Sequence, residues 1–272
     1  MRKHLAGRLA AGIAAVIFIG CTGCAGMGNS GKNGDKSLQK VLDTGKLIIG
    51  VDDSYPPMGF ADGSGGIVGF DVDTAQEVCD LLGVTLETKP INWDTKEEAL
   101  NSGEIDCIWN GMSVSDKRAD TMEFSEPYLK NEMVFVVAGN SNVRSYSELA
   151  EKRIGYQSGS TAQDALEASG VFRNAVLKGY PNNVMMLEQL ESGAIDAGII
   201  DSVVIYYYIL KNGSGFYILP GNLREESFAV GFRKGDLALR NKVQELLEEM
   251  NVNGKLAEIS VKWFGSDITI VR

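Results

Sequence analysis

Histidine is almost absent from the 272-residue sequence: the only one is His4, close to the first residue. His4 lies in a stretch with the features of a cleavable export signal, so we expect the mature protein to contain no imidazole. Imidazole is the base of Ser-His-Asp and Cys-His catalysis and a common ligand of zinc. Its absence excludes both kinds of catalytic site and every zinc site that uses histidine, and we expect no metal ion and no cofactor.

Cysteine is also scarce, with four residues in the chain. Cys79 and Cys107, the two beyond the export signal, are too far apart in the sequence to form a Cys-x-x-Cys motif, which leaves redox and metal chemistry without support. Cys79 lies in a helical pattern and Cys107 in a strand pattern, both among apolar residues. Two buried free thiols, or a disulfide between them in an exported protein, are both open.

Basic residues are outnumbered, with 26 against 36 acidic residues and a formal charge of −10. Loss of residues 1–23 removes Arg2, Lys3 and Arg8 and leaves 23 basic residues against the same 36 acidic ones. An acidic surface repels phosphate backbones, which excludes nucleic acid as a partner. The 44% hydrophobic and 23% charged residues are typical of a folded globular protein with one large domain or two ordinary ones.

The N-terminus differs from the rest, because residues 1–8 are basic and residues 9–23 are uncharged and mostly apolar. An apolar helix of this length extends only about 22 Å, less than the roughly 30 Å of a hydrocarbon core. The pattern therefore predicts a signal peptide over residues 1–23 and not a membrane span.

Thr22-Gly23-Cys24-Ala25 is similar to a bacterial lipobox, in which the cysteine is acylated and becomes the first residue. We expect Cys24 to carry a lipid anchor that holds the exported protein on the outer face of the cell membrane, or on the periplasmic side of an envelope membrane. Acylation of Cys21 instead, and an ordinary signal peptide without acylation, are the alternatives. Residues 24–36, rich in glycine and polar residues, are predicted to form a flexible tether.

Strand and helix patterns alternate along residues 37–131, which is typical of a parallel sheet built from crossover units. Apolar runs predict strands at 46–51 and 104–109, and an alternating pattern predicts a strand at 84–89. Apolar residues at helical spacing, each group followed by glycine, predict helices at 71–82 and 95–102.

One pattern occurs twice, in residues 100–111 and 190–201: a helix end, Ser-Gly, an apolar strand, and a polar residue where the strand ends. The repeat predicts two similar α/β lobes. Ligands of open parallel sheets bind beyond the carboxyl ends of the strands. Residues 110–113 and Asp201 are therefore expected to face a ligand cleft between the lobes.

The last part of the chain has a strand pattern at 228–233 and two helical patterns between residues 237 and 265, with an apolar face that can pack on the first lobe. The chain is thus predicted to pass between the lobes twice, near 130–138 and 224–230, which makes a two-stranded hinge. We predict two lobes, formed by residues 37–131 with 229–272 and by residues 132–228.

Six short segments occur in this order: Gly50-Val-Asp-Asp-Ser-Tyr-Pro-Pro-Met58, Gly69-Phe-Asp-Val-Asp73, Ile105-Asp with Gly111-Met-Ser-Val-Ser-Asp-Lys-Arg118, Phe124-Ser-Glu-Pro-Tyr128, Ile154-Gly-Tyr-Gln-Ser-Gly-Ser-Thr161 and Lys262-Trp-Phe264. Together they resemble the polar-amino-acid solute-binding proteins of ABC importers, the type 3 extracellular binding-protein family. The resemblance implies a two-lobed α/β fold of the type II periplasmic-binding-protein kind. In that fold each lobe is a mixed sheet flanked by helices, and a ligand cleft and a two-stranded hinge lie between the lobes.

The resemblance also implies an amino acid ligand, whose carboxylate needs donors. A guanidinium can hold a carboxylate through two parallel hydrogen bonds, and Arg118 is the candidate, with the Ser113 hydroxyl beside it. Ser160 and Thr161 precede a helical pattern, where exposed backbone N–H groups also attract a carboxylate. The alternatives are a solvated cation at Arg118 and simple helix capping by Ser160 or Thr161.

The ammonium group of such a ligand needs acceptors. In the family pattern the acid that matches Asp201 pairs with this group, helped by the Ser113 hydroxyl and the Gly111 carbonyl. The alternative is that Asp201 caps the helical pattern that follows it.

The ligand side chain is expected to lie against Tyr55 and Trp93, with Asp52 and Asn110 also facing it. Asp52 matches a family position that can contact a distal cationic group, which favours arginine or lysine as the ligand. The same segment also occurs in family members that bind glutamine, histidine or cystine, so these ligands stay open. Core packing is the alternative for the aromatic residues, and for Trp109 both roles are open.

We therefore expect a monomer that binds a polar amino acid and delivers it to an ABC transporter permease, without catalysis of its own. An enzyme on the same scaffold, similar to cyclohexadienyl or arogenate dehydratases, is the alternative. That alternative is weakened by the scarcity of histidine and by the lack of an evident pair of carboxylates for acid–base chemistry.

Overall fold

The computed structural model describes residues 34–213 and 215–272. The predicted signal peptide, the acylation candidates Cys21 and Cys24, and the predicted tether as far as residue 33 lie outside the described residues. The folded unit begins at Asp35. The carboxylate of Asp35 accepts hydrogen bonds from the backbone N–H groups of Ser37 and Ala238, and so joins the first helix to the C-terminal part of the chain.

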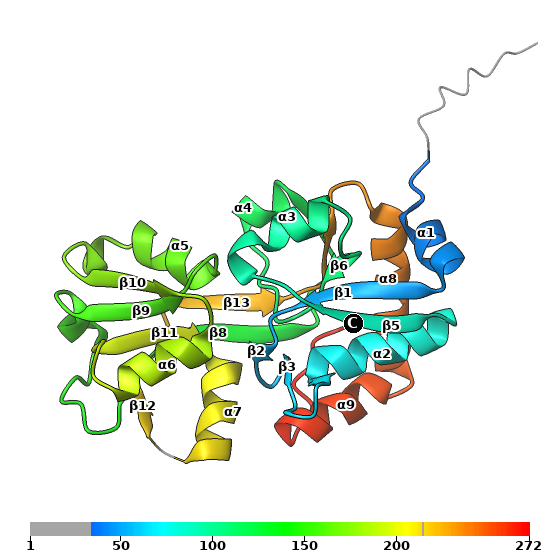
Figure 1. The fold of residues 1–272 in the computed structure, drawn as a ribbon. Helices are drawn as coiled ribbons and strands as arrows, with labels where there is room; N and C mark the ends of the chain where they lie inside the picture. The colour runs from blue at the N-terminus through cyan, green and yellow to red at the C-terminus, as the bar shows by residue number, and fades with distance from the viewer. Residues whose placement is uncertain (1–33, 214) are drawn as a thin grey trace, which may run out of the picture. The chain divides into compact units, whose positions relative to one another are not determined.

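The first lobe is built on a five-stranded sheet (Figure 1). In spatial order its strands are β5 (Thr85–Pro90), β1 (Lys46–Val51), β6 (Cys107–Ile108), β14 (Gly231–Arg233) and β7 (Met122–Phe124). β1 pairs in parallel with β5 and β6, whereas β14 pairs antiparallel with β6 and β7, so the sheet is mixed. A separate small sheet contains β2 (Ser54–Tyr55), β3 (Gly59–Ala61) and β4 (Ile67–Val68).

The helices of the first lobe come from both ends of the described chain. They are α1 (Ser37–Thr44), α2 (Phe70–Leu82), α3 (Lys96–Asn101), α4 (Asp116–Ala119), α8 (Leu237–Val252) and α9 (Lys255–Phe264). α1 packs on α8 and α2 packs on α9, so the C-terminal helices complete this lobe. α8 buries Leu239, Val243, Leu246, Leu247 and Met250, at the spacing of one helix face.

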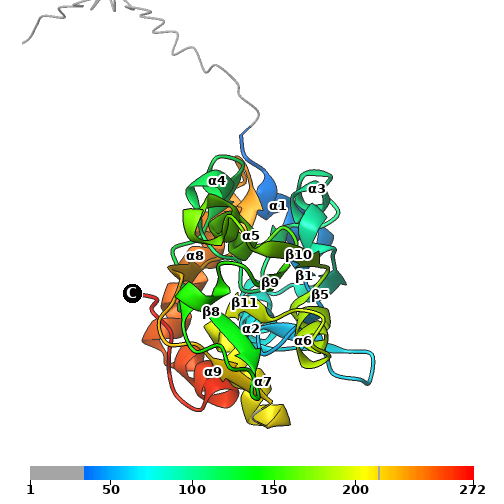
Figure 2. The same ribbon diagram turned by 90° about the vertical axis from the view of Figure 1, so that its left-hand side faces the viewer.

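The second lobe has its own mixed sheet. In spatial order its strands are β10 (Val176–Tyr180), β9 (Arg153–Gln157), β11 (Ala197–Asp201), β8 (Leu129–Ala138) and β12 (Phe216–Ile218), with β13 (Arg224–Phe228) also paired to β8. Its main helices are α5 (Thr161–Ala168), α6 (Asn183–Glu191) and α7 (Ser202–Asn212). Figures 1 and 2 show α5 on one face of this sheet and α6 and α7 on the other, which explains why every residue of β11 is buried.

Strands β8 and β13 of the second sheet run antiparallel toward the first lobe, from Arg224 opposite Met133 to Phe228 opposite Leu129. The prediction of one strand over residues 228–233 is wrong. Phe228 ends β13, and β14 begins only at Gly231, because here the chain leaves β8 and takes new partners in the sheet of the first lobe. The strand predicted at 104–109 is also too long, since only Cys107 and Ile108 pair with β1.

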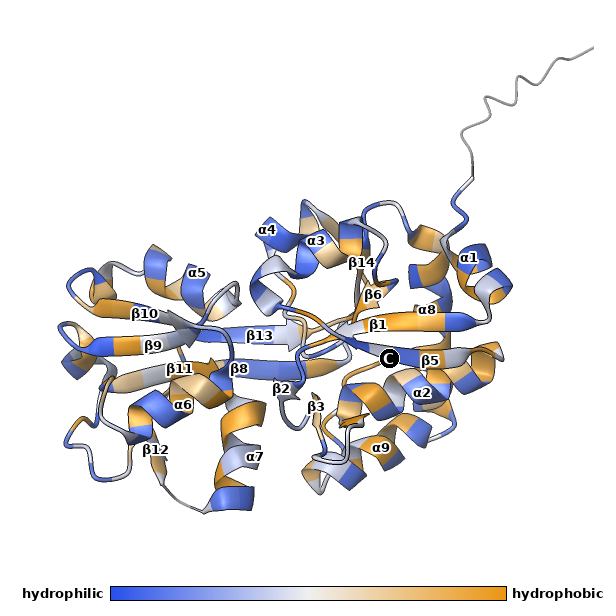
Figure 3. Cartoon of the chain, in the orientation of Figure 1, coloured by the Kyte–Doolittle hydropathy of each residue, from blue (hydrophilic) through white to orange (hydrophobic). Residues whose placement is uncertain are grey.

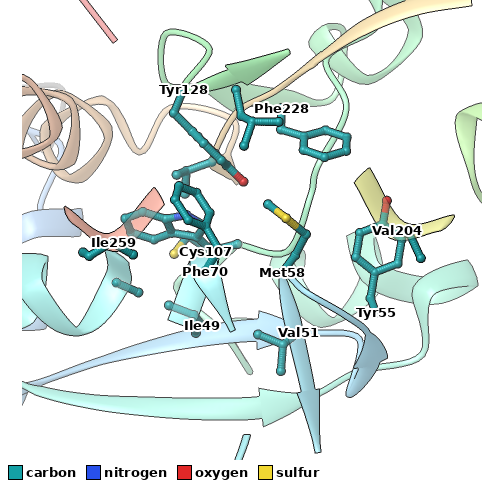
Figure 4. Packing of buried hydrophobic residues seen from close by; sticks show 14 of the residues in the cluster. Ile49, Val51, Tyr55, Met58, Phe70, Cys107, Tyr128, Val204, Phe228 and Ile259 are labelled. Carbon is teal, nitrogen blue, oxygen red and sulfur yellow. The ribbon is translucent and has the colours of Figure 1, made fainter. Parts of the chain in front are cut away.

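Cys79 and Cys107 are both buried and free, so the disulfide alternative is wrong and the thiol alternative is confirmed. Figure 4 shows Cys107 beside Phe70 and near Ile49 in the core of the first lobe. Burial raises the pKa of the Cys79 thiol to about 12, which suits an unreactive core side chain. Trp109 is fully buried in the same core, which favours its packing role.

The observed fold is the expected one: α/β, with two lobes that each contain a mixed sheet and flanking helices. β1 is apolar over most of its length, whereas β13 is hydrophilic (Figure 3). No helix within residues 34–213 and 215–272 is long and apolar enough to cross a membrane. The same residues contain no cluster of three or more His, Cys, Asp or Glu side chains suited to a metal ion.

Candidate functional site

Asp52 lies just after β1, at the carboxyl end of a central strand, and its carboxylate contacts both lobes. Oδ1 accepts hydrogen bonds from the backbone N–H and the hydroxyl of Ser54, at 3.0 and 2.7 Å. Oδ2 accepts a hydrogen bond of 2.6 Å from Nε2 of Gln157, on the second lobe. Burial raises the pKa of Asp52. The carboxylate therefore lies at the interface between the lobes, where the sequence predicted it.

Asn110 and Gly111 form the turn after β6. The Asn110 Oδ1 accepts a hydrogen bond of 3.2 Å from the backbone N–H of Asp52, so this amide fixes the loop that carries Asp52. Gly111 has φ of +55°, and a Cβ there would lie 2.6 Å from Cε1 of Tyr55. Only glycine permits both the backbone angle and this close approach.

Asp71, which is not among the predicted site residues, supports this turn through a hydrogen bond to its backbone. Its Oδ2 accepts a hydrogen bond of 2.6 Å from the backbone N–H of Gly111. The side chain is fully buried, and burial raises the pKa of Asp71 to about 7. The sequence held one indication of this role, because Asp71 lies in the segment from Gly69 to Asp73, one of the six segments that resemble the family.

Arg118 lies on α4, which begins after the N-cap Ser115. Its Nη1 donates to the carbonyl of Ser113 at 2.8 Å, and its Nη2 donates to the carbonyl of Gly159, on the second lobe, at 3.2 Å. Only 5% of Arg118 is exposed, which is incompatible with a solvated surface cation. Within the part of the chain that the structure describes, Arg118 forms no ion pair with a carboxylate.

Ser160 and Thr161 begin α5 and differ in what they contact. Ser160 is the N-cap: its hydroxyl accepts from the backbone N–H of Gln163 at 3.4 Å and donates to the carbonyl of Gln157 at 2.7 Å. Its side chain thus serves its own helix. The Thr161 hydroxyl instead donates to Oε2 of Glu226 at 3.0 Å.

Glu226, on β13, is a buried acid that the sequence analysis missed. Its Oε2 also accepts a hydrogen bond of 2.6 Å from the Ser113 hydroxyl. Ser113 and Thr161 come from different lobes, so one carboxylate joins two of the predicted carboxylate-binding groups. No motif in the sequence pointed to Glu226. The one indication was that it lies within residues 224–230, where the chain was predicted to pass between the lobes for the second time.

Asp201 ends β11 and precedes α7, but its side chain makes no capping hydrogen bond. Its Oδ2 accepts from the hydroxyl of Tyr55, on the first lobe, and its Oδ1 accepts from Nδ2 of Asn131 on β8. Burial, and then the nearby charge of Glu226, raise the pKa of Asp201 to about 7, while Arg118 acts in the opposite direction. The capping alternative is therefore wrong, and Asp201 faces the other lobe.

Trp93 and Lys96 form a further contact between the lobes. The Lys96 Nζ donates to the carbonyls of Trp93 and Gly159, at 3.0 and 2.8 Å, and lies 5.3 Å from the centre of the Trp93 ring. Burial, and then Arg118, lower the pKa of Lys96 to about 7. The Trp93 ring packs with Leu100 and Ile105 in a small core cluster, so core packing accounts for much of its surface.

The predicted residues thus divide into two groups. Six side chains, or their immediate partners, meet between the lobes: Asp52, Tyr55, Ser113, Arg118, Thr161 and Asp201. The side chains of Asn110, Trp93 and Ser160 instead serve a loop, a core cluster and a helix cap. A cavity of about 250 Å³ opens next to Arg118, the one member of the first group that lines it. Its lining also includes Lys96, Gly159 and Ser160 and four acids, Asp94, Glu97, Asp164 and Glu167.

The site has buried charges of both signs. Arg118 and Lys96 supply positive charge, and Asp52, Asp201 and Glu226 supply negative charge; each residue is at most 8% exposed. Buried charges are costly unless they are paired and hydrogen-bonded. This arrangement is suited to binding a small molecule that itself carries charges of both signs.

Comparison with known proteins gives a consistent result. A family model for bacterial extracellular solute-binding proteins, family 3, matches residues 47–266. The chain is 28% identical over 268 residues to the L-cystine-binding protein TcyJ of Escherichia coli strain K12, and the match covers 98% of each chain.

Two solved structures are also similar. Tv2483 bound to L-arginine has a TM-score of 0.84 and 30% identity, and the match covers 88% of this chain and 98% of that one. An ABC uptake transporter substrate-binding protein from Streptococcus pneumoniae with bound histidine has a TM-score of 0.80 and 35% identity, covering 87% and 98%.

Proposed function

The chain belongs to the bacterial extracellular solute-binding proteins of family 3, and from this premise we propose that it captures a polar amino acid outside the cytoplasm and delivers it to the permease of an ABC importer. Relatives that bind cystine, arginine and histidine support an amino acid as the ligand. The match over most of both chains supports the same task for the whole folded unit.

One observation carries the proposal: Arg118 on the first lobe and Asp201 on the second are both buried, and each side chain forms a hydrogen bond with the opposite lobe, Arg118 with the Gly159 carbonyl and Asp201 with the Tyr55 hydroxyl. An amino acid carries a carboxylate and an ammonium group on adjacent atoms. We assign Arg118, Ser113, Thr161 and the backbone at Ser160 to the carboxylate. We assign Asp201, the Ser113 hydroxyl and the Gly111 carbonyl to the ammonium group.

The side chain of the ligand is assigned to Tyr55, Trp93, Asn110 and Asp52. Asp52 is buried and directly follows β1 of the first lobe, so it can pair with a cation at the far end of a long side chain. Buried acids outnumber buried bases around the site, which also favours a ligand with an extra positive charge. A basic amino acid, such as arginine, lysine or histidine, is therefore the proposed ligand.

The ribbon of β8 and β13 is proposed to be the hinge, with lobes of residues 37–131 with 229–272 and of residues 132–228. Closure removes water from the site and strengthens each charge pair, because the local dielectric constant falls. Closure also changes the shape of the binding protein, so that the permease can distinguish the ligand-bound form from the free form. Export by the signal peptide, acylation of Cys24 and a flexible tether would hold the monomer next to that permease. No catalytic step belongs to this cycle.

The test is isothermal titration calorimetry of the purified mature protein with each of the twenty L-amino acids. We expect one or a few polar amino acids, basic ones among them, to bind with micromolar affinity or better, about −8 kcal/mol, which a ligand of about ten heavy atoms can reach. Binding should also raise the melting temperature by mass action. Absence of binding across the whole panel would overturn the proposal.

A further inference from the structure

The carboxylate of Glu226 accepts hydrogen bonds from two of the donors that we assign to the carboxylate of the ligand. Its Oε2 accepts one hydrogen bond from the Ser113 hydroxyl at 2.6 Å and another from the Thr161 hydroxyl at 3.0 Å. The negative charge of Glu226 also acts on Arg118. Burial lowers the pKa of Arg118, and Glu226 is the acid that opposes this effect most strongly. One acid of the chain thus engages the donors from both lobes.

These donors cannot serve two carboxylates at once. Each hydroxyl has a single proton to donate, and an ionised carboxylate only accepts hydrogen bonds. A ligand carboxylate beside that of Glu226 would also meet a like charge in a buried site, where repulsion is poorly screened. Binding of the ligand carboxylate at Ser113 and Thr161 therefore requires Glu226 to give up its place.

Glu226 has an alternative partner in Arg224, two residues before it on the same face of β13. Its Oε1 has no hydrogen-bond partner, and Nε of Arg224 lies 3.7 Å from it. Glu226 also lines a cavity of about 580 Å³, together with Asn131, Glu225 and Ser227. A rotation of the side chain toward Arg224 would keep the carboxylate beside a cation and in reach of water.

We propose, on the basis of the function proposed above, that Glu226 is a specificity-determining residue whose carboxylate competes with the ligand carboxylate for the hydroxyl donors of Ser113 and Thr161 and for the positive charge of Arg118. The competition lowers the affinity for every α-amino acid, because part of the binding energy is used to displace Glu226. It does not act against an amine that lacks the carboxylate, because Glu226 then stays in place and supplies the negative charge next to Arg118.

Three variants test the proposal by calorimetry with L-arginine, L-lysine and L-histidine. Glu226→Ala removes the competitor and should raise the affinity for the amino acid that binds by about tenfold, if the displaced state is populated about a tenth of the time. Glu226→Gln should give a smaller gain, since its amide oxygen can still accept from Ser113 and Thr161. Glu225→Gln is the matched control, because Glu225 is the exposed neighbour on the same strand.

The corresponding amines, agmatine, cadaverine and histamine, provide the second measurement. Because they carry no carboxylate, Glu226→Ala should leave their affinity unchanged or reduce it. The ratio of amino acid affinity to amine affinity should therefore rise by about tenfold or more. A general loosening of the fold would shift both ligands in the same direction and would not change this ratio.

The inference is overturned if Glu226→Ala and Glu226→Gln, with melting temperatures like that of the wild type, bind the amino acid no more tightly than the wild type does. An unchanged ratio between amino acid and amine also overturns it. If neither the wild type nor any variant binds an amino acid, the proposed function fails together with the inference. Tight binding that is insensitive to residue 226 rejects the inference alone.

Discussion

The amide of Gln157 on the second lobe donates a hydrogen bond of 2.6 Å to the carboxylate of Asp52 on the first lobe. The orientation of this amide is set by Asn183, whose Nδ2 donates to the Gln157 Oε1 at 3.2 Å. Asp52 therefore accepts hydrogen bonds only from neutral donors, Ser54 and Gln157, and has no cation at hydrogen-bonding distance among the described residues. A ligand cation that reaches Asp52 would form an ion pair with its carboxylate, in which donor and acceptor are both charged.

Asp52→Asn is expected to weaken the binding of a basic amino acid by about 10- to 100-fold, because the ligand cation would lose its charged partner in a buried site. Binding of L-glutamine should change by less than about threefold, since its amide makes no charge pair. Calorimetry with L-arginine, L-lysine and L-glutamine measures both effects. Asp53→Asn is the control, because Asp53 is exposed and adjacent in the chain. Equal losses for charged and neutral ligands would contradict the assignment of Asp52 to the distal cation.

Gly159→Ala is expected to impair closure of the lobes. Gly159 has φ of +70°, and a Cβ there would lie 2.8 Å from Cα of Asp94, on the backbone of the opposite lobe. Because the added atom would meet backbone and not the end of a flexible side chain, we expect the lobes to shift apart, and ligand affinity should fall by about tenfold or more. Calorimetry gives the affinity, and small-angle scattering with saturating ligand gives the change in radius of gyration.

Gly193→Ala is a matched control for this prediction. Gly193 has nearly the same angle, φ of +74°, but a Cβ there would meet nothing within 4 Å. Both variants should lose about 1 kcal/mol of stability from the strained backbone angle. Only Gly159→Ala should lose ligand affinity. If the two variants bind equally well, the close contact at Gly159 does not control closure.

How much the sequence reveals depends on whether a residue's role is local. Arg118 and Asp201 could be selected because each follows a recognisable pattern and lies at the end of a strand or in a motif. Ser160 could be identified as a cap for the same reason, and the structure gives it that role. The alternation of strands and helices over residues 37–131 also followed from local apolar spacing and from the glycines that end the helices.

The partners of these residues could not be predicted, because they depend on contacts between distant segments. Glu226 reaches Ser113 and Thr161 only through the pairing of β13 with β8 and the placement of both lobes. Asn131 and Gln157 meet Asp201 and Asp52 in the same way. Gln157 lies in the family-like segment from Ile154 to Thr161, but nothing in that segment points to Asp52 as its partner. Glu226 and Asn131 have no local pattern that distinguishes them from ordinary polar residues on a strand.

The stability of the protein is expected to fall as the pH rises from about 4 to 7. Burial raises the pKa of Asp71 from 3.8 to about 7, so in this range the folded protein holds a proton that the unfolded chain has lost. The contribution of Asp71 to the free energy of unfolding is therefore fully present below the unfolded pKa of 3.8. It is lost as the pH rises toward the folded pKa, by about 1.4 kcal/mol per pH unit for each such group. Urea unfolding at pH 5 and pH 7 measures this slope.

Asp71→Asn should reduce that slope, because the amide has no proton to lose. Asp201, whose pKa is also raised to about 7, would account for the part that remains. The control is Asp80→Asn, on the exposed side of the same helix, which should retain the wild-type slope. A wild-type stability that is flat or rises between pH 5 and pH 7 would show that neither buried acid controls it.

Arg118→Met is expected to weaken amino acid binding by about 100-fold or more, because the ligand carboxylate would then be buried without a cation. Arg118→Lys should recover only part of this loss, since an ammonium cannot reproduce the two parallel hydrogen bonds of a guanidinium. Lys117→Met, beside it on α4 but exposed, is the control. Calorimetry measures all three, and unchanged affinity in Arg118→Met would reject the carboxylate assignment.

Amino acid binding near pH 6.5 is expected to release a proton from Asp201. Burial and the charge of Glu226 raise the pKa of Asp201 to about 7, so a large fraction of this acid is protonated at that pH. The ligand ammonium group favours the ionised carboxylate, so its arrival lowers the pKa and expels the proton. The affinity should accordingly rise with pH between about 5 and 7 and then level off.

Calorimetry at pH 6.5 in buffers with different ionisation enthalpies gives the number of protons released. The wild type should release a substantial fraction of one proton, and less at pH 8, where Asp201 is already ionised. Asp201→Asn should bind about 100-fold more weakly, because the ammonium group loses its charged partner, and at high ligand concentration it should release no proton. Asp196→Asn, which alters an acid that pairs with Arg153 near the start of the same strand, should retain the proton release. Binding without proton exchange at pH 6.5 would mean that Asp201 is ionised before the ligand arrives, or that the ammonium group binds elsewhere.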